Sequence, residues 1–403
     1  MLRPELLIGF DAIVAIEDAW RGLYERSGAS FSMSPTWLSA WWRAMHDAPV
    51  DPFGKRTGFG VGLRDEQGEL RGLALFCRRW ARVAAVPRLR LDILGSGEPK
   101  ADEVCTDYAT VLAAPEDRDD VARGLVAALL GNGALRWDDV VLPMMRRDDP
   151  MLDALVRAFV RRGLDVDLAR TGTSTMATLR PTFDAYLASL PKKHRYAIKR
   201  SVSDFESWAA GLGGHTFERV DRPADLPRGL ETLIALHAAR WGASHLFTSR
   251  RFHRFHEEVT RSMIEGVDAK LDLWILRAGE RPVAALYNIA AGRTVSNYQA
   301  GRVMDLPRGI KPGIVANVYA LKQAIADGFT EYDFLPGEAL YKHQLGNAEL
   351  PVVTLRVSRS DARAVGLDLL TSVVRRAAWS IDSAPRRSRG DVPPTHEASA
   401  GGD

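Results

Sequence analysis

Apolar residues recur at helical spacing, or alternate with polar ones, along most of the chain. Residues 34–46 read SPTWLSAWWRAMH, with Ser34 as a helix cap, Pro35 at the first helical position and large apolar side chains three or four residues apart. Alternation and helical periodicity predict further elements in this half: strands near 59–64, 71–77, 89–94 and 138–144, and a helix over 118–131. The first half is therefore predicted to mix helices and strands.

The second half begins with two predicted helices separated by Pro191. Ile198, Val202 and Phe205 form the apolar stripe of the second helix. Its other faces carry basic residues: Lys192, Lys193, Arg195, Lys199 and Arg200. These residues form either a solvated face or an anion-binding surface. More elements follow: a helical region over 228–264 and strands over 271–278, 282–290 and 294–301.

The order of elements after residue 301 is informative about function. A loop over 302–313, a helix over 313–327, a strand over 330–335 and a short polar helix follow in turn. Residues at spacings of three and four give the longer helix one buried stripe, and Gly328 suits its C-cap. This order points a helix N-terminus out of a splayed sheet edge, where α/β sheets tend to bind ligands.

The loop PRGIKPGI has the composition of an anion-binding turn. Gly309 and Gly313 let the backbone approach a ligand closely, and Arg308 and Lys311 lie beside the positive end of the helix dipole. The loop contains neither a GxxxxGK[ST] nor a GxGxxG pattern. Pyrophosphate binding and ordinary turn chemistry are both open on these residues alone.

Composition limits the class of protein. A chain of 403 residues with 46% hydrophobic residues has material for two domains, and a net charge of +3 does not favour a duplex nucleic-acid partner. Cys77 and Cys105 are the two cysteines, and the nine histidines show no paired metal spacing, so we expect no metal cofactor and a reducing compartment.

No apolar run approaches the roughly 18–20 residues that span a bilayer. The N-terminal LLIGFDAIVAI is interrupted by Asp11 and suits a first strand or helix better than a signal peptide, so we expect a cytoplasmic protein. We predict a C-terminal helix over 361–382. The final residues 383–403 are rich in Pro, Gly, Ser and charge, which predicts a disordered tail.

A family resemblance appears in ALYKHQLGN at 339–347. This stretch resembles the helix of GNAT acetyltransferases that places a tyrosine beside the coenzyme A sulfur. The matching tyrosine is Tyr341 and the matching glycine is Gly346, while Asn347 stands where an aromatic residue is usual. Compared with typical GNAT proteins the phosphate loop is degenerate, because Arg308 is followed only by Lys311 and Gly313.

The stretches FSMSPTWLSAWW, LPKKHRYAIKRSVSDFE, WDDVVLP and YDFLPGEALYKHQLG are together similar to CelD/BcsL-like GNAT proteins, a group related to Fem-type peptidyltransferases. The resemblance spans nearly all of 30–358. It implies an α/β (α+β) fold of two tandem GNAT-like domains, each a mixed, mostly antiparallel sheet flanked by helices. The expected domains are residues 1–178 and, with the acyl-CoA site, residues 179–360.

The resemblance also implies roles for individual residues. Acetyl-CoA is the expected acyl donor, and Tyr341 is the expected proton donor to the leaving thiolate. The donor is expected to contact two groups of residues: Gln299, Ala300 and Gly301 on the strand, and Arg308, Gly309, Lys311, Gly313 and Ile314 in the loop and helix. Lys342 either stabilises negative charge on a phosphate or on the thioester oxygen or is an exposed helix residue, and His343 either titrates near neutrality or is likewise exposed. The resemblance favours Lys342 over His343 for a role in the site.

The remaining candidates concern the acceptor. Asp333 is a general base, acting directly or through water, or else an ordinary ion-paired strand carboxylate. Arg240 and Trp241 end an apolar-striped helix and suit an acceptor pocket, or a core tryptophan beside a surface arginine. Tyr298 is placed with them in the acceptor pocket.

Three functions follow as hypotheses. The first is an acyl-CoA-dependent N-acyltransferase acting on an amine of a small molecule or of a cell-envelope or polysaccharide precursor. The second is a Fem-like aminoacyl or peptidyl transferase, with the basic helix contacting tRNA phosphates. The third is a non-catalytic accessory protein of polysaccharide biosynthesis built on the same scaffold.

Overall fold

The computed structural model describes residues 2–48, 56–83, 86–131, 135–242 and 246–359, together with 366 and 369–372. The predicted tail lies outside the described residues. Of the predicted helix over 361–382, only residue 366 and residues 369–372 are described, and these are helical.

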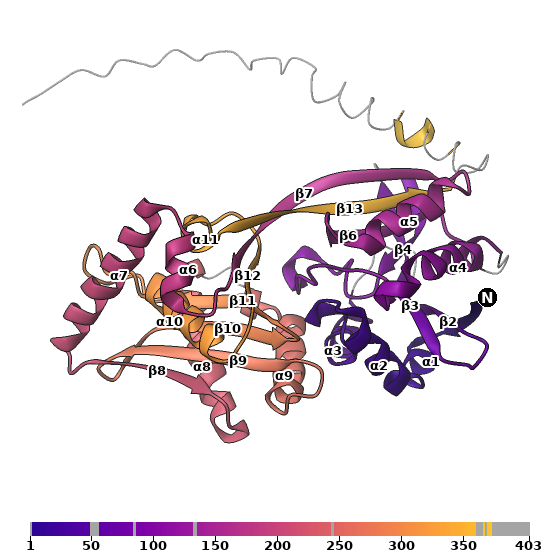
Figure 1. Ribbon diagram of the computed structural model, residues 1–403. Coiled ribbons are helices and arrows are strands. Elements are labelled where there is room, and N and C mark those ends of the chain that lie inside the picture. Colours follow the sequence, from indigo (N-terminus) through magenta and orange to yellow (C-terminus); the bar gives the residue numbers. More distant parts are fainter. Residues whose placement is uncertain are drawn as a thin grey trace, which may run out of the picture.

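Thirteen strands of the described residues form one sheet (Figure 1), in the order β1-β2-β3-β4-β6-β13-β7-β12-β11-β10-β9-β8 with β5 beside β3. The N-terminal half supplies β1 (Arg3–Ile8), β2 (Thr57–Arg64), β3 (Leu70–Val83), β4 (Val86–Ile93), β5 (Leu112–Ala113) and β6 (Asp139–Arg146). The C-terminal half supplies β8 (His215–Val220), β9 (Lys270–Ala278), β10 (Arg281–Ala291), β11 (Thr294–Arg302) and β12 (Glu331–Pro336).

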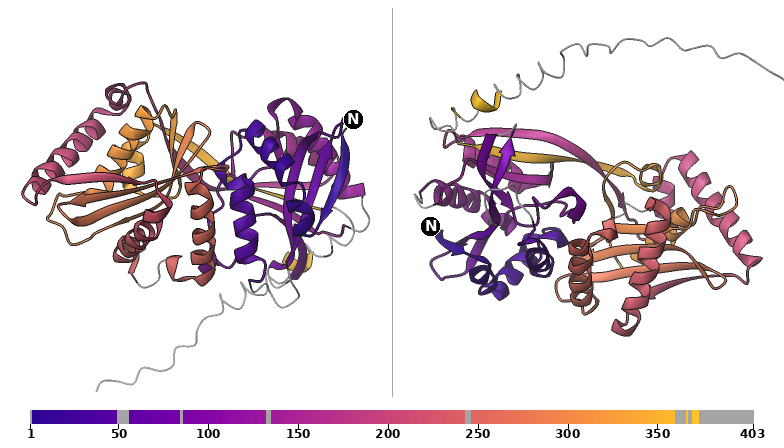
Figure 2. Two further views of the ribbon diagram at one scale, coloured as in Figure 1. Left: turned by 90° about the horizontal axis from the view of Figure 1, so that it is seen from below. Right: turned by 180° about the vertical axis from the view of Figure 1, so that it is seen from behind.

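Helices lie on both faces of the sheet in each half (Figure 2). The N-terminal half contains α1 (Phe10–Val14), α2 (Glu17–Ser27), α3 (Pro35–Met45), α4 (Arg118–Gly131) and α5 (Pro150–Val160). The C-terminal half contains α6 (Phe183–Ser189), α7 (Lys192–Ala210), α8 (Leu226–Trp241), α9 (Arg250–Ile264), α10 (Pro312–Ala326) and α11 (Leu340–Leu345). The predicted fold class, a mixed and mostly antiparallel sheet flanked by helices, is confirmed.

The two halves repeat one arrangement. In each, two neighbouring strands run parallel and are joined through a helix: β4, α4 and β6 in the first half, β11, α10 and β12 in the second. All other strand pairs are antiparallel. The repeat is what a tandem GNAT-like fold requires.

A two-stranded ribbon connects the halves (Figure 1). It consists of β7 (Asp165–Thr178) and β13 (Ala348–Ser358), which pair along the whole length of β13. β7 continues into the C-terminal half by pairing with β12, whereas β13 pairs with β6 of the N-terminal half. The last strand of the described chain therefore completes the sheet of the first half.

A buried carboxylate anchors β13 in this position. Asp139 on β6 has no exposed side-chain surface and lies 3.2 Å from Nη1 of Arg88 and 3.0 Å from Nη2 of Arg356. The hydroxyl of Ser358 donates to the same carboxylate at 2.8 Å. Since Arg356 and Ser358 belong to β13, the Asp139 carboxylate joins β13 to β4 and β6.

The aromatic helix predicted over 34–46 is confirmed as α3, capped by the Ser34 hydroxyl, which accepts from the Trp37 amide at 3.2 Å. Its aromatic face packs between the halves. The Trp37 ring lies edge-on to Phe255 of α9 at 4.7 Å and to Tyr298 of β11 at 5.3 Å between ring centroids. Burial of aromatic area is thus one source of the interdomain contact.

Most predicted elements are present with boundaries shifted by a few residues. The strands β7, β8 and β13 were not predicted. On β7 exposed residues predominate before Gly172, so hydrophobic alternation is weak there. This strand forms because backbone hydrogen bonds to β13 pair it, and its sequence carries little sign of that pairing.

We predict that Asp139→Asn destabilises the protein, because Arg88 is left as a buried, partly uncompensated charge. Removing one partner of a buried ion pair costs about 3–5 kcal/mol. Urea unfolding monitored by tryptophan fluorescence measures this loss. The control is Asp153→Asn, which removes a carboxylate from an exposed pair with Arg147. Equal midpoints for the two variants would contradict the anchoring role of Asp139.

Candidate active site

The parallel strands β11 and β12 separate in the middle of the C-terminal half. They pair only over Thr294–Ser296 and Glu331–Asp333. Beyond that point β11 remains paired with β10, and the register shifts between Tyr287 and Asn288, which leaves Tyr298 as the extra residue of a β-bulge. The edge of β11 that faces β12 is therefore free of strand partners in the described structure, and the two strands enclose a gap.

The residues predicted to bind the acyl donor come from β11, from the loop that follows it and from the start of α10. Gln299, Ala300 and Gly301 lie on β11 beyond the separation, and α10 begins beside it. Arg308, Gly309 and Lys311 are exposed in the loop, where Gly309 has a φ of 98° that favours glycine. Gly313 and Ile314 are half-buried on the first turn of α10.

Two of these glycines have packing reasons of their own. A β-carbon on Gly301 would lie 2.5 Å from the backbone nitrogen of His237, so Gly301 lets α8 lie directly on β11. A β-carbon on Gly313 would lie 3.1 Å from Cδ of Arg302, so Gly313 leaves room for that side chain. The lack of a side chain at Gly301 is thus explained by the packing of α8 against β11.

Positive charge gathers around the gap. Burial, and next the neighbouring charge of Arg240, lowers the pKa of Arg302. The charge of Arg240 also acts on Tyr341 and Lys342, where it favours their deprotonated forms. Arg302 was not among the predicted site residues. The side chain of Trp241, predicted beside Arg240, lies outside the described residues.

Tyr341 lies at the separation point itself. Its hydroxyl donates to Oδ1 of Asn297 at 3.4 Å, and Asn297 is buried on β11 directly after the last paired residue. Asn297 in turn donates to Asn288 at 2.8 Å. Burial raises the pKa of Tyr341, so the phenol retains its proton at neutral pH. The position suits a proton donor.

Lys342 faces the protein interior. Its ammonium donates to the carbonyls of Leu335 at 2.9 Å and Pro336 at 3.1 Å. Leu335 has a φ of 59°, which is unfavourable for a branched side chain, and the ammonium holds this turn at the end of β12. Its two described hydrogen bonds are thus both to backbone carbonyls, and its expected contact with a phosphate or thioester oxygen stays a prediction. His343 is exposed and pairs with Glu349 at 2.9 Å.

Gly346 and Asn347 dock the end of α11 onto β7. A β-carbon on Gly346 would lie 2.2 Å from Cγ2 of Thr175. The Asn347 side chain accepts from the Thr178 amide at 2.8 Å and donates to the Thr178 carbonyl at 3.1 Å. Both residues of this part of the motif are therefore structural.

Asp333 is buried where β12 leaves β11. Its Oδ1 accepts from the Ser174 hydroxyl at 2.9 Å and from the Leu335 amide at 2.8 Å. The Tyr108 hydroxyl donates to Ser174 at 2.6 Å, which forms a chain of hydrogen bonds from the N-terminal half to the carboxylate. Burial raises the pKa of Asp333, and the hydrogen bond from Leu335 opposes that rise.

A second carboxylate, Asp107, was missed by the sequence analysis. It is buried in the loop after β4, and burial followed by repulsion from Asp333 raises its pKa to about 8. Lys342 acts in the opposite direction. Nothing in the local sequence marks Asp107, because its importance comes from Asp333 and Lys342, more than two hundred residues away in the chain.

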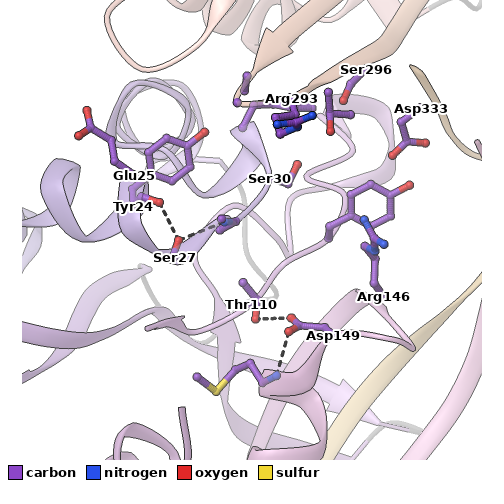
Figure 3. A pocket seen from close by; sticks show the side chains of 18 of the residues that line it. Tyr24, Glu25, Ser27, Ser30, Thr110, Arg146, Asp149, Arg293, Ser296 and Asp333 are labelled. Atoms are coloured by element: carbon purple, nitrogen blue, oxygen red, sulfur yellow. Dashed lines mark hydrogen bonds between the residues drawn. The ribbon is translucent and has the colours of Figure 1, made fainter. Parts of the chain in front are cut away.

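A cleft of about 710 Å³ between the halves reaches Asp333 from the side of the N-terminal half. Its walls come from α2, the Tyr108–Ala113 segment, the start of α5 and the β10–β11 turn. Figure 3 shows Asp333, Arg146, Arg293 and Ser296 around one space, with Tyr24 and Glu25 farther along the wall. Arg146 is held by Asp148 through two hydrogen bonds, at 3.0 and 2.9 Å. The volume suits a small-molecule ligand.

Neither Arg240 nor Tyr298 lines this cleft. The Tyr298 side chain is buried between the halves, and Arg240 lies on the side of Tyr341 and Arg302. The predicted acceptor residues are thus not brought together in one pocket. In the described part of the chain, no group of three or more His, Cys, Asp and Glu side chains could hold a metal ion, and no helix is long and apolar enough to cross a membrane.

The family model of the acetyltransferase (GNAT) domain matches residues 192–343, from α7 to α11. The predicted resemblance is confirmed, and this segment is a GNAT acetyltransferase domain. The match contains β11, α10, β12 and Tyr341, the elements that enclose the gap. No curated protein matches the chain in sequence.

Solved structures share the fold over nearly the whole chain. The C-terminal domain of a putative lysylphosphatidylglycerol synthetase from Agrobacterium fabrum aligns with a TM-score of 0.52 and 13% identity, covering 90% of this chain and 96% of that one. L-PGS from Bacillus licheniformis gives 0.50 and 14%, covering 89% and 96%. FemX gives 0.54 and 11%, covering 83% and 95%. At these identities the likeness is one of fold.

We predict that Lys342→Met lowers stability, because the carbonyls of Leu335 and Pro336 lose their buried donor. Leaving buried acceptors unsatisfied costs about 1–3 kcal/mol each. Thermal and urea unfolding measure the loss. His343→Gln, one residue along the same helix, is the control and should leave the midpoint unchanged. A Lys342→Met protein as stable as the control would show that the ammonium does not hold the turn.

Proposed function

We propose that this GNAT acyltransferase transfers an acyl group, acetyl in the simplest case, from a CoA thioester to an amine of a small molecule or cell-envelope precursor. The observation that carries the proposal is the position of Asp333. It lies where the gap between β11 and β12 begins and also lines the cleft between the halves. A donor held in the gap and an acceptor held in the cleft would therefore meet at this carboxylate.

The residues around the gap fit a CoA donor. CoA supplies an activated thioester and a phosphate-rich tail. Arg308 and Lys311 at the mouth, with Arg302 farther in, provide positive charge for that tail. The backbone of the β11 bulge provides donors for a carbonyl oxygen that becomes more negative during transfer. Gln299 to Gly301 are therefore proposed to contact the CoA thioester.

Asp333 is proposed as the base. An amine attacks only when neutral, so its proton must leave before or during attack. Asp333 accepts from Ser174 and Leu335 at Oδ1 and lines the cleft, so its carboxylate borders the space proposed for the acceptor. As the new N–C bond replaces the C–S bond, the amine proton passes to Asp333. Tyr341 is proposed to return a proton to the thiolate and to recover it from solvent.

One observation favours a second candidate, the transfer of an aminoacyl group from tRNA. The first three turns of α7 expose Lys192, Lys193, Lys199 and Arg200, and Tyr196 among them is 67% exposed. A basic face with an exposed aromatic ring suits single-stranded nucleic acid. α7 contacts α11, so the helix that bears this face lies next to the helix that carries Tyr341.

We predict that acetyl-CoA raises the melting temperature of the protein, because it binds only the folded chain. A ligand at one hundred times its dissociation constant adds about 2.7 kcal/mol. Arg308→Gln with Lys311→Gln should weaken this protection, whereas Lys192→Gln with Lys193→Gln should not. The aminoacyl-tRNA alternative predicts the reverse dependence, together with tRNA binding that falls steeply with salt.

We predict that Asp333→Asn lowers kcat about 10²- to 10⁴-fold, the usual contribution of a general base, with a smaller effect on KM. The wild-type rate should rise with pH, because burial raises the pKa of Asp333 and the base must be deprotonated. Steady-state kinetics across pH measure both effects. His343→Gln should keep full activity. A folded Asp333→Asn protein with wild-type turnover would rule out Asp333 as the base, whereas a folded wild-type protein without any turnover would favour a non-catalytic scaffold.

A further inference from the structure

Tyr298 connects β11, the strand proposed to contact the acyl donor, to the N-terminal half. It is the bulged residue of β11, and its side chain is 7% exposed. Its hydroxyl donates to the carbonyl of Val104 at 2.5 Å, across the contact between the halves. Val104 begins the loop that carries Asp107 and Tyr108. A side chain on β11, the strand proposed to contact the acyl donor, therefore holds a loop of the N-terminal half beside the cleft proposed for the acceptor.

The hydrogen-bond direction at Tyr298 follows from its neighbours. Burial lowers the pKa of His256 to about 3, so its ring is neutral and has one donor and one acceptor nitrogen. Since the Tyr298 hydroxyl donates to Val104, it accepts from Nε2 of His256 at 3.3 Å. Nδ1 then accepts from Tyr287 at 3.4 Å. The chain of hydrogen bonds runs in one direction, from Tyr287 to the Val104 carbonyl.

The loop held in this way has a strained backbone. Cys105 and Tyr108 have φ values of 55° and 64°, in the left-handed region that non-glycine residues avoid. Such strain persists only where the surroundings fix it. Contacts that fix it include the Tyr298 hydrogen bond at one end, the Ser32 hydroxyl on the Asp107 carbonyl at 2.5 Å, and the Met144 carbonyl on the Tyr108 amide at 2.9 Å. The Trp37 indole also donates to the Thr106 hydroxyl at 3.1 Å, and the Glu98 carboxylate accepts from the Val104 amide at 2.9 Å.

The strained loop delivers two groups to Asp333. The Tyr108 hydroxyl reaches the Asp333 carboxylate through Ser174. The buried Asp107 carboxyl interacts with Asp333 through its charge. A small displacement of the loop would therefore change both the hydrogen bonding and the electrostatic surroundings of the proposed base.

We propose that Tyr298 is a positioning residue, whose hydroxyl fixes the Val104–Tyr108 loop across the interdomain contact and thereby sets the environment of Asp333. The catalytic part of this inference rests on the proposed role of Asp333 as base. Because the same residue forms the bulge of β11, one side chain holds both β11 and the Val104–Tyr108 loop.

The first test needs no substrate. Carboxyl ¹³C NMR of aspartate-labelled protein follows the titration of Asp107, assigned by its loss in Asp107→Asn. In Tyr298→Phe the loop loses its anchor, water enters, and the pKa of Asp107 should fall from about 8 by about one unit or more, since burial is the main cause of its elevation. The charged or titratable groups that interact with Asp107 are Glu103, Cys105, Tyr108, Tyr298, Asp333 and Lys342.

The matched control is Tyr287→Phe. It removes a hydroxyl from the same buried aromatic cluster and the same hydrogen-bond chain but does not touch the loop. Ser32→Ala removes a further side-chain anchor, on the Asp107 carbonyl itself, and should shift the Asp107 titration in the same direction as Tyr298→Phe. An unchanged Asp107 titration in a folded Tyr298→Phe protein, or an equal shift in Tyr287→Phe, would overturn the proposal.

The second test uses turnover. Tyr298→Phe should lower kcat on the order of tenfold through misplacement of the base and should move the pH–rate profile, while Tyr287→Phe leaves the profile in place. In an Asp107→Asn, Tyr108→Phe background, Tyr298→Phe should have little further effect, and a full additional effect there contradicts the proposal. Absence of turnover in the wild type would count against the proposed function alone, because the NMR titration is read without substrate.

Discussion

The structure depends on the burial of one carboxylate, Asp333, at the junction of two GNAT-like halves. A buried carboxylate is tolerated only where donors and neighbouring charges compensate its loss of water. Here Ser174 on β7 and the Leu335 amide supply the donors, while Lys342 on α11 and Arg146 of the N-terminal half supply positive charge. No single half contains this set, so the site exists only when the halves are packed together.

The ribbon of β7 and β13 makes that packing follow from the order of the elements along the chain. α11 carries Tyr341 and Lys342, and the chain continues through Gly346 and Asn347 into β13. β13 starts beside Met176 and ends at the Asp139 cluster in the sheet of the other half. The helix with the proposed acid is thus fixed at one end by the β12 turn and at the other by a strand buried in the N-terminal half. Stability of the ribbon and geometry of the site are linked by covalent continuity.

Local patterns in the sequence were sufficient to predict part of this arrangement. The helical spacing of α3 and α10 and the alternation of β9 to β11 are local properties, and they predicted elements that enclose the gap. Tyr341 was singled out by the family resemblance. Asp107 and Ser174 carry no local pattern, because their roles arise from contacts with residues more than 150 positions away. The ligand role of Lys342 came from the family resemblance alone, and the local sequence gave no sign that the backbone carbonyls of a strained turn hold its ammonium.

The motif that carries the family resemblance combines two kinds of constraint. Gly346 and Asn347 are required by the docking of α11 on β7, and Lys342 by the end of β12, so these positions would be maintained in a protein that had lost its activity. Tyr341 is different, because its hydroxyl makes only a long bond of 3.4 Å to Asn297 and packing alone would accept phenylalanine. A retained hydroxyl at 341, together with a retained carboxylate at 333, therefore distinguishes a working transferase from a scaffold better than the motif as a whole.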